Sequence, residues 1–161
     1  MSLFENKFKS ALKSNVVLLD KIMYYIIKRK GKQIRPMFVF LSAKLFGKVE
    51  EGTFVAASMI ELLHTATLIH DDIVDDAQLR RSALSINTIW KNKIAVLTGD
   101  YFLAKGLKLA VQYSDYDILL LISNVVQEIV EGELIQIEKT KKLNLKEEDF
   151  YKIISLKTGS L

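Results

Sequence analysis

Four carboxylates lie within six residues near the middle of the chain, at Asp71, Asp72, Asp75 and Asp76. On a helix, Asp71 and Asp75 are one turn apart, so both side chains project from the same face. Like charges on one face repel each other, and acidic residues late in a helix oppose its dipole, so the cluster requires a cation. Carboxylate oxygens, in a chain without cysteine, favour Mg²⁺, which keeps several waters and is completed by substrate phosphates. The spacing therefore predicts a magnesium site that binds a phosphorylated ligand.

A histidine lies on nearly the same helical face as these carboxylates. His64 precedes Asp71 by seven residues, which is two helical turns or roughly 10 Å. A single histidine on a helix is more often a packed or surface side chain than a ligand. Because His64 shares a face with the predicted magnesium site, it is a candidate for ligand binding.

The basic residues come in three groups. Arginine pairs bind phosphate in a bidentate manner, and lysine supplies a compact point charge. Any one group alone is typical of a solvated loop, but their convergence with the carboxylates on one cavity would form a site for a small phosphorylated ligand. The groups are Lys32 with Arg35, Arg80 with Arg81, and Lys157 beside Thr158.

The composition limits the fold and the compartment. The 161 residues are 50% hydrophobic and 26% charged, which fits one globular domain or part of a larger one. One proline and seven glycines leave few breakers for many short strands, so we expect an all-α fold. The absence of cysteine excludes disulfides, zinc-thiolate sites and cysteine nucleophiles, and makes the cytoplasm the default location. We see no secretion signal and no stretch of membrane-spanning length.

The net charge of +4 suits an anionic partner. The basic residues are scattered along the chain, without a base-stacking aromatic pattern or a zinc finger, so nucleic acid is not the expected partner. A small phosphorylated ligand fits the charge better.

The elements that must position these residues follow from apolar periodicity. We expect Gly31 to end the first helix, Pro36 to occupy the first position of the next, and Asn144 with Glu147 to form a capping box. Gly99 and Gly106 are possible points of close packing. The pattern predicts an up-and-down array of long helices over residues 3–30, 36–46, 53–79, 94–113, 117–139 and 147–157, with a short helical turn over 85–90.

Together these residues resemble the trans-isoprenyl diphosphate synthases, the polyprenyl synthetase family. The similarity extends over nearly the whole chain, and its motifs occur in the family's order, which makes the set far more specific than any one motif. The matching segments are Gly31-Lys32-Gln33-Ile34-Arg35-Pro36, Glu61-Leu62-Leu63-His64, Asp71-Asp72-Ile73-Val74-Asp75-Asp76, Arg80-Arg81, Gly99-Asp100-Tyr101, Gly132-Glu133-Leu134-Ile135-Gln136 and Lys157-Thr158.

The resemblance implies an isoprenoid synthase bundle and a Mg²⁺-dependent prenyltransferase, which condenses an allylic diphosphate with isopentenyl diphosphate into a longer trans-polyprenyl diphosphate. It also implies a role for each matching residue. Asp71 and Asp75 would bind Mg²⁺ on the allylic diphosphate, supported by Asp72 and Asp76. The same diphosphate would be held by Arg80 and Lys157. Gln136 and Thr158 would lie near the allylic cation. The residues expected to hold isopentenyl diphosphate are Lys32, Arg35, His64 and Arg81.

The resemblance further implies a homodimer and a product length. Aromatic side chains four and five residues before the first aspartate stop growth early in the family, whereas Ala66 and Thr67 are small. With Leu63 two turns below Asp71, these residues predict a product longer than farnesyl.

Two departures from the family pattern limit what this chain is expected to do. Ser82, Ala83 and Leu84 replace the usual glycine, polar residue and proline after the arginines. Family members are also about twice as long and carry a second aspartate-rich motif. Residues 1–161 therefore correspond to the N-terminal half of such a domain, with little or no turnover expected from this chain alone.

Three alternatives stay open. The pair His70-Asp71 is compatible with an HD-type metal phosphohydrolase, although only two histidines are present. A terpene cyclase would share the acidic helix but not the segment from Lys32 to Pro36. The non-catalytic alternative is a helical interaction subunit whose apolar helices over 94–139 form an oligomer interface.

Overall fold

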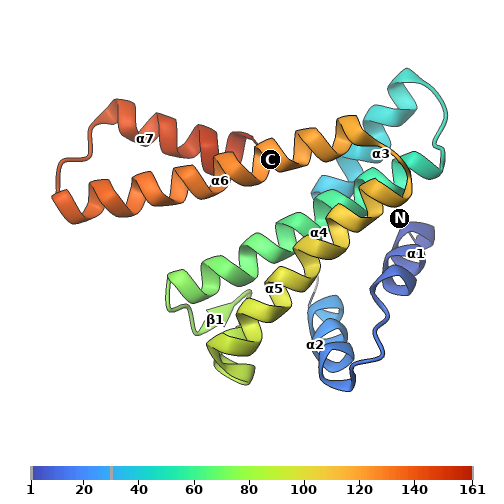
Figure 1. Ribbon diagram of the computed structural model, residues 1–161, viewed down its shortest axis with the longest axis horizontal. Coiled ribbons are helices and arrows are strands. Elements are labelled where there is room, and N and C mark those ends of the chain that lie inside the picture. Colours follow the sequence, from blue (N-terminus) through green and yellow to red (C-terminus); the bar gives the residue numbers. More distant parts are fainter. Residues whose placement is uncertain (1, 30, 161) are drawn as a thin grey trace. The chain divides into compact units, whose positions relative to one another are not determined.

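The computed structural model describes residues 2–29 and 31–160, and nearly all of this chain is helical (Figure 1). The expectation of an all-α fold is confirmed. The chain divides into two compact units, Met1–Tyr113 and Ser114–Leu161. The elements are α1 (Ser2–Leu12), α2 (Val17–Lys28), α3 (Ile34–Phe46), α4 (Glu51–Val74), β1 (Leu79–Arg80), β2 (Ala83–Leu84), α5 (Ile86–Gln112), α6 (Tyr116–Lys142), α7 (Glu147–Ile154) and a π-helix (Ser155–Gly159).

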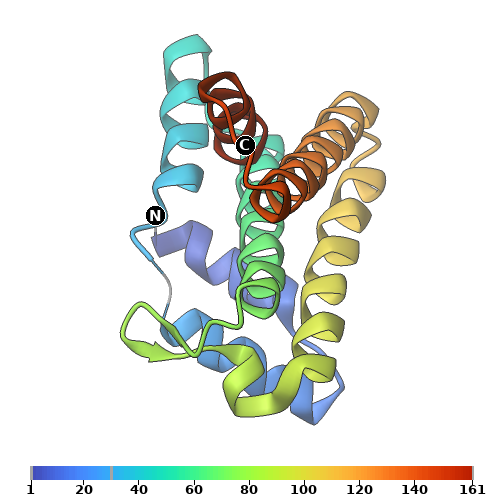
Figure 2. The same cartoon turned by 90° about the vertical axis from the view of Figure 1, so that its left-hand side faces the viewer.

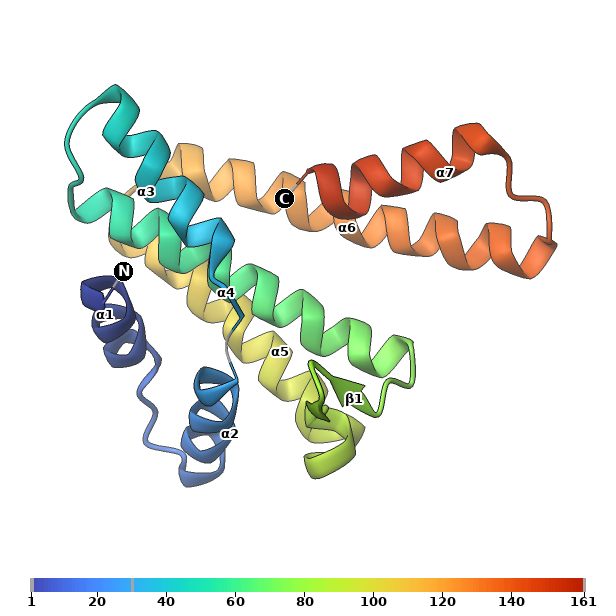
Figure 3. The ribbon, with the colours of Figure 1, turned by 180° about the vertical axis from the view of Figure 1, so that it is seen from behind.

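The first unit is organised around α4 and α5, which lie side by side in Figures 1 and 3. Helix α4 buries side chains around most of its circumference. Helix α3 packs against α4. Figure 2 shows α4, in green, running beside α5, in yellow. The core residues come from four helices: Phe4, Phe8 and Leu12 of α1, Ile22 and Met23 of α2, Ala57, Leu62, Ala66 and Ile69 of α4, and Ile86, Ala95 and Phe102 of α5.

The single helix predicted over residues 3–30 is wrong, because the chain breaks between α1 and α2. The Ser14 hydroxyl accepts a hydrogen bond from the Val16 amide at 3.1 Å, and Val16 is extended, with φ −90° and ψ 109°. Serine and asparagine side chains compete with helical backbone bonds in this way. Both halves still place their apolar stripe in the core. The predicted end at Lys30 lies outside the described residues.

The next helix begins two residues earlier than predicted. Helix α3 starts at Ile34, so Pro36 occupies its third position instead of its first. This is still within the first turn, where a missing N–H costs no intrahelical hydrogen bond. The preceding Gln33 is left-handed, with φ 51°. The turn places Arg35 at the start of α3.

Helix α4 ends at Val74, earlier than the predicted residue 79, because Asp76 takes a left-handed conformation with φ 50°. A short antiparallel hairpin follows, pairing Leu79 with Leu84 and Arg80 with Ala83. Its two turn residues, Arg81 and Ser82, both have positive φ, as in a type I′ turn. The sequence analysis missed this hairpin.

Helix α5 contains the predicted break. Lys91 is non-helical, with φ 72° and ψ 159°, and separates the short helical turn from the longer helix. Gly99 is a close-packing point, as predicted: a Cβ atom there would lie 2.3 Å from Nε2 of His70 on α4. The largest helix–helix interface of this unit therefore depends on a residue without a side chain.

The expectation that no stretch reaches membrane-spanning length is wrong for α4. By length and composition, the helix Glu51–Val74 is long and apolar enough to cross a membrane. In its most apolar 18-residue stretch, 44% is buried within the structure. Because the core helix of a soluble protein passes the same test, α4 is accounted for by its place in the core.

In the second unit α6 and α7 lie side by side (Figure 3). Lys139 of α6 forms an ion pair with Asp149 of α7 at 3.0 Å. The predicted capping box of Asn144 and Glu147 is wrong: α7 begins after Lys146, whose amide donates to Asp149 Oδ2 at 3.1 Å.

The chain continues from α7 into the π-helix, which lies against α6. A Cβ atom on Gly132 would lie 2.9 Å from Leu156 Cβ and 3.0 Å from Lys157 Cγ. Gly132 therefore permits the close approach of the segment that carries Lys157.

Candidate functional site

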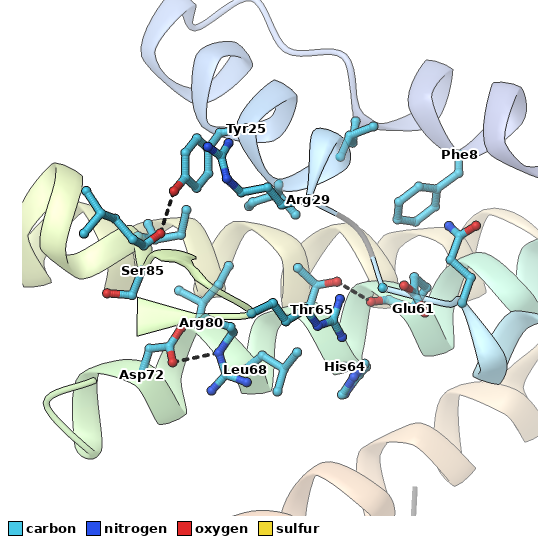
Figure 4. Close-up of a pocket in the computed structure, with 18 of the residues that line it drawn as sticks. Phe8, Tyr25, Arg29, Glu61, His64, Thr65, Leu68, Asp72, Arg80 and Ser85 are labelled. Carbon is cyan, nitrogen blue, oxygen red and sulfur yellow. Dashed lines mark hydrogen bonds and ion pairs between the residues drawn. The ribbon is translucent and has the colours of Figure 1, made fainter. Parts of the chain in front are cut away.

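The end of α4 and the hairpin form one wall of a cavity of about 120 Å³ in the first unit (Figure 4). Arg80 Nε donates to Asp72 Oδ1 at 2.7 Å, and Asp72 is only 3% exposed. Burial raises the pKa of the Asp72 carboxyl, and the hydrogen bond from Arg80 opposes that rise. Asp72 thus holds Arg80 in place. Its supporting role in metal binding stays a prediction.

The base of the hairpin is fixed by a polar network at the start of α5. Ser85 Oγ donates to the Ala77 carbonyl at 2.7 Å. Asn87 Nδ2 donates to the carbonyls of Asp72 and Ala77 at 3.2 Å and 3.3 Å. These bonds connect the end of α4 to α5, so both ends of the arginine-bearing segment are anchored.

Asp71 and Asp75 lie at the C-terminal end of α4. Asp75 and its neighbour Asp76 are exposed, and Asp71 is half-buried. Among residues 2–29 and 31–160, no group of three His, Asp or Glu side chains is arranged to hold a metal ion by itself. Two carboxylates one turn apart still suit Mg²⁺, which keeps several waters and takes further oxygens from substrate phosphates. The donor set therefore fits a metal that is completed by its ligand.

Three of the four residues predicted to hold isopentenyl diphosphate come together in the structure. Arg35 Nη1 lies 3.0 Å from His64 Nε2. The Arg81 guanidinium packs on the backbone at Gly31, where a Cβ atom would lie 2.3 Å from Nη1. The fourth residue, Lys32, follows Gly31 directly and is exposed. Arg35 at the start of α3, His64 of α4 and Arg81 of the hairpin therefore form one basic cluster.

The surroundings of His64 keep its imidazole neutral. Burial, together with the positive charges of Arg35, Arg81 and Arg80, lowers the pKa of His64 to about 4. A neutral imidazole can accept a hydrogen bond at Nε2, which fits the contact with Arg35, since a guanidinium can only donate.

Glu61 is a charged member of this cluster that the sequence analysis did not single out. It lines the cavity one helical turn before His64 (Figure 4). Burial raises the pKa of the Glu61 carboxyl, and Arg35 and Arg81 oppose the rise. Glu61 lies three residues before His64, so both side chains lie on the same face of α4. This spacing is the feature of the sequence that could have identified Glu61 as part of the site.

In the second unit the structure brings Lys157 and Gln136 together, and their separate roles at the diphosphate and near the allylic cation stay predictions. Lys157 Nζ donates to Gln136 Oε1 at 2.9 Å and forms an ion pair with Glu133. Thr158 is exposed within the π-helix. Such helical irregularities are frequent at functional sites. Glu133 is a second carboxylate that the predicted site did not include.

The residues assigned to product length differ in their surroundings. Leu63 and Ala66 are 3% and 2% exposed, and Ala66 belongs to the core cluster. Thr67 is half-buried, and its hydroxyl donates to the His64 carbonyl at 3.0 Å. The chain-length role stays a prediction, and Thr67 is the most accessible of the three side chains.

His70 faces α5. Its Nε2 lies 3.4 Å from Asp100 Oδ1, against Gly99. The pair His70-Asp71 therefore does not form a metal-binding group with a third His, Asp or Glu in the described part of the chain.

An all-α fold with an acidic helix end beside the half-buried Arg35 and Arg80 is typical of the isoprenoid synthase class. Comparison with protein families matches residues 16–161 to the family described as polyprenyl synthetase. The chain belongs to the polyprenyl synthetase family.

Curated relatives and solved structures agree with this family. The octaprenyl diphosphate synthase of Escherichia coli is 34% identical over 150 residues, which cover 93% of this chain and 46% of the relative. The decaprenyl-diphosphate synthase of Dictyostelium discoideum is 36% identical over 145 residues, covering 89% of this chain and 31% of that protein.

Among solved structures, the polyprenyl synthase of Caulobacter crescentus, complexed with calcium and isoprenyl diphosphate, has a TM-score of 0.93 at 31% identity. The match covers 99% of this chain and 49% of that one. Heptaprenyl diphosphate synthase from Staphylococcus aureus has a TM-score of 0.90 at 33% identity, covering 99% and 51%. The chain spans at most about half the length of these relatives.

The environment of His64 leads to a prediction that nuclear magnetic resonance can test. The His64 imidazole should titrate near pH 4 instead of 6.5. The unfolded state then binds more protons than the folded state between these values, so stability should rise with pH across this window. Added inorganic pyrophosphate should raise the pKa of His64, because its negative charge offsets Arg35 and Arg81.

The variant His64→Gln assigns the signal, since His70 is the only other histidine. A His64 imidazole that titrates at its ordinary value in the absence of pyrophosphate would contradict the described cluster.

Proposed function

We propose that the chain is part of a prenyltransferase that condenses an allylic diphosphate with isopentenyl diphosphate to make a longer linear trans-polyprenyl diphosphate. The observation that carries this proposal is the basic cluster of Arg35, His64 and Arg81, built around the same helix that ends in Asp71 and Asp75. The names of the relatives, octaprenyl, decaprenyl and heptaprenyl synthases, support a product longer than farnesyl.

In this reaction the C–O bond of the allylic diphosphate breaks, and the electron pair leaves with the diphosphate. The double bond of isopentenyl diphosphate then attacks the allylic carbon, and a proton is lost to form the new double bond. Fixed cations lower the barrier because they stabilise the charge that develops on the leaving group. We assign this task to Arg80, oriented by Asp72, and to Lys157, oriented by Glu133 and Gln136.

Mg²⁺ held by Asp71 and Asp75 would supply further positive charge at the leaving diphosphate. Asp75 is exposed and Asp71 is half-buried, and two carboxylates one turn apart suit such a shared ligand set. Isopentenyl diphosphate keeps its diphosphate, and the cluster of Lys32, Arg35, His64 and Arg81 would hold it without metal. The hydroxyl of Thr158 and the amide of Gln136 would lie near the allylic cation.

The same proposal covers the whole protein. Residues 1–161 would be the N-terminal half of a longer synthase, and the half-length matches to the relatives support this. The whole synthase would be a homodimer in the cytoplasm. In that case the isolated chain would bind ligands but turn over slowly or not at all. Binding is therefore the appropriate measurement.

Calorimetric titration of the metal-free chain with isopentenyl diphosphate tests the proposal. Arg35→Ala should weaken binding about tenfold, because a charge-assisted contact to phosphate is lost. The matched control is Lys44→Ala, an exposed cation in the last turn of the same helix, which should bind as the wild type does. Equal affinities of both variants, or strictly metal-dependent binding, would contradict the proposal.

A further inference from the structure

Tyr25 of α2 reaches across to the arginine hairpin (Figure 4). Its hydroxyl donates a hydrogen bond to the Leu84 carbonyl at 2.6 Å, over a sequence separation of 59 residues. The same peptide unit donates through the Ser85 amide to the Gln78 carbonyl at 2.9 Å. The peptide that follows the second strand is thus held at its oxygen by α2 and at its nitrogen by Gln78, the residue before β1.

The Tyr25 ring is itself held by neighbouring side chains. The Trp90 ring packs edge-on against it, with centroids 5.2 Å apart. The Arg29 guanidinium lies over it, 3.8 Å from the centroid. These contacts fix the direction of the hydroxyl, because the ring cannot rotate away without losing them.

The hairpin requires outside support. It pairs only two residues per strand, and a two-stranded hairpin is marginal by itself in water. Its turn residues, Arg81 and Ser82, occupy left-handed conformations without a glycine. Arg80 is anchored to Asp72 near the strand end, whereas Arg81 has its guanidinium against the backbone at Gly31. The position of the Arg81 backbone therefore depends on how the second strand is held.

We propose that Tyr25 is a positioning residue: its hydrogen bond to the Leu84 carbonyl sets the hairpin so that Arg81 meets the diphosphate in the cluster with Arg35 and His64. This inference rests on the proposed function. It assigns to α2 a part in ligand binding without direct contact to the ligand.

The substitution Tyr25→Phe tests this, because it removes the hydroxyl and keeps the ring on Trp90 and Arg29. The dissociation constant for isopentenyl diphosphate, measured by calorimetry, should rise about fivefold, the value of one hydrogen bond. The matched control is Tyr24→Phe, the neighbouring tyrosine, which is 68% exposed and should leave the constant unchanged. An unchanged constant in Tyr25→Phe would overturn the inference.

A double-mutant cycle separates positioning from general destabilisation. In an Arg81→Lys background, Tyr25→Phe should weaken binding less than about twofold, because the contact on which it acts is already altered. The same fivefold loss in both backgrounds would overturn the inference, since Tyr25 would then act independently of Arg81.

Amide hydrogen exchange tests the same contact without ligand. The Ser85 amide should exchange faster in Tyr25→Phe than in Tyr24→Phe, and equal rates would overturn the inference. A wild-type chain that binds no isopentenyl diphosphate would contradict the proposed function and the ligand-positioning role of Tyr25 with it, whereas the exchange of Ser85 would still test whether Tyr25 holds the hairpin.

Discussion

Arg80→Ala should destabilise the chain by about 3 kcal/mol at neutral pH, because it leaves the buried Asp72 carboxylate without its partner. The Asp72 side chain is 4% exposed and the Arg80 side chain is 35% exposed. Without the ion pair, the carboxylate would therefore have neither a partner nor water, whereas the guanidinium could still reach water. The converse change, Asp72→Asn, should cost less, since Arg80 can turn toward water. Urea unfolding followed by circular dichroism measures both.

The loss in Arg80→Ala should depend on pH in a defined direction. Burial already raises the pKa of Asp72, and removal of Arg80 raises it further. A group with a folded-state pKa above its unfolded value favours folding at low pH, and this contribution is lost as pH rises through the folded value. The difference in the free energy of unfolding between Arg80→Ala and the wild type should therefore become smaller as pH falls from about 7 toward 5.

Two further variants control this result. The double variant Arg80→Ala with Asp72→Asn should recover part of the stability, because no buried charge remains unpaired. Lys108→Ala, an exposed cation on α5, should have little effect. If Arg80→Ala were no more destabilising than Lys108→Ala at any pH, the buried ion pair would not stabilise the fold.

Gly99→Ala should destabilise the chain by about 1–3 kcal/mol, the usual cost of inserting a methyl group into a filled space. The added Cβ would lie 2.3 Å from the His70 ring, so the ring must leave its place beside Asp100 and the α4–α5 contact must adjust. His70 precedes Asp71, so this displacement should also weaken magnesium-dependent ligand binding. Thermal unfolding with and without ligand measures both effects.

The matched control is Gly52→Ala, at a glycine of α4 with no atom within 4 Å of an added Cβ. This change should stabilise by about 0.5–1 kcal/mol, because alanine favours a helix over glycine. In a His70→Ala background, Gly99→Ala should cost little. An equal cost with and without the His70 ring would show that the clash lies elsewhere.

Much of the fold could be predicted from apolar periodicity, since the stripe of each helix decides which face enters the core. The break between α1 and α2 could not, because the apolar spacing continues through Ser14 while a local side-chain hydrogen bond ends the helix. The hairpin was missed for a related reason. Its turn uses Arg81 and Ser82 in left-handed conformations, where glycine or asparagine is the usual signal.

The site was predicted in its residue types more than in its contacts. Arg35, His64 and Arg81 lie together as expected, and Lys157 contacts Gln136. Motif spacing could not show that Asp72 turns inward to hold Arg80, because burial at a helix end depends on what packs against it. Partners such as Tyr25 act through the backbone of a distant segment and leave no mark in a motif.

The central claim is tested most directly by calorimetric titration with an unreactive allylic thiodiphosphate, with and without Mg²⁺, on the wild-type chain and on Asp71→Ala. The account predicts binding that requires both the metal and Asp71, because the carboxylates at the end of α4 and the ligand phosphates would share the ion. Binding that is unchanged without Mg²⁺, or equally strong in Asp71→Ala, would contradict it.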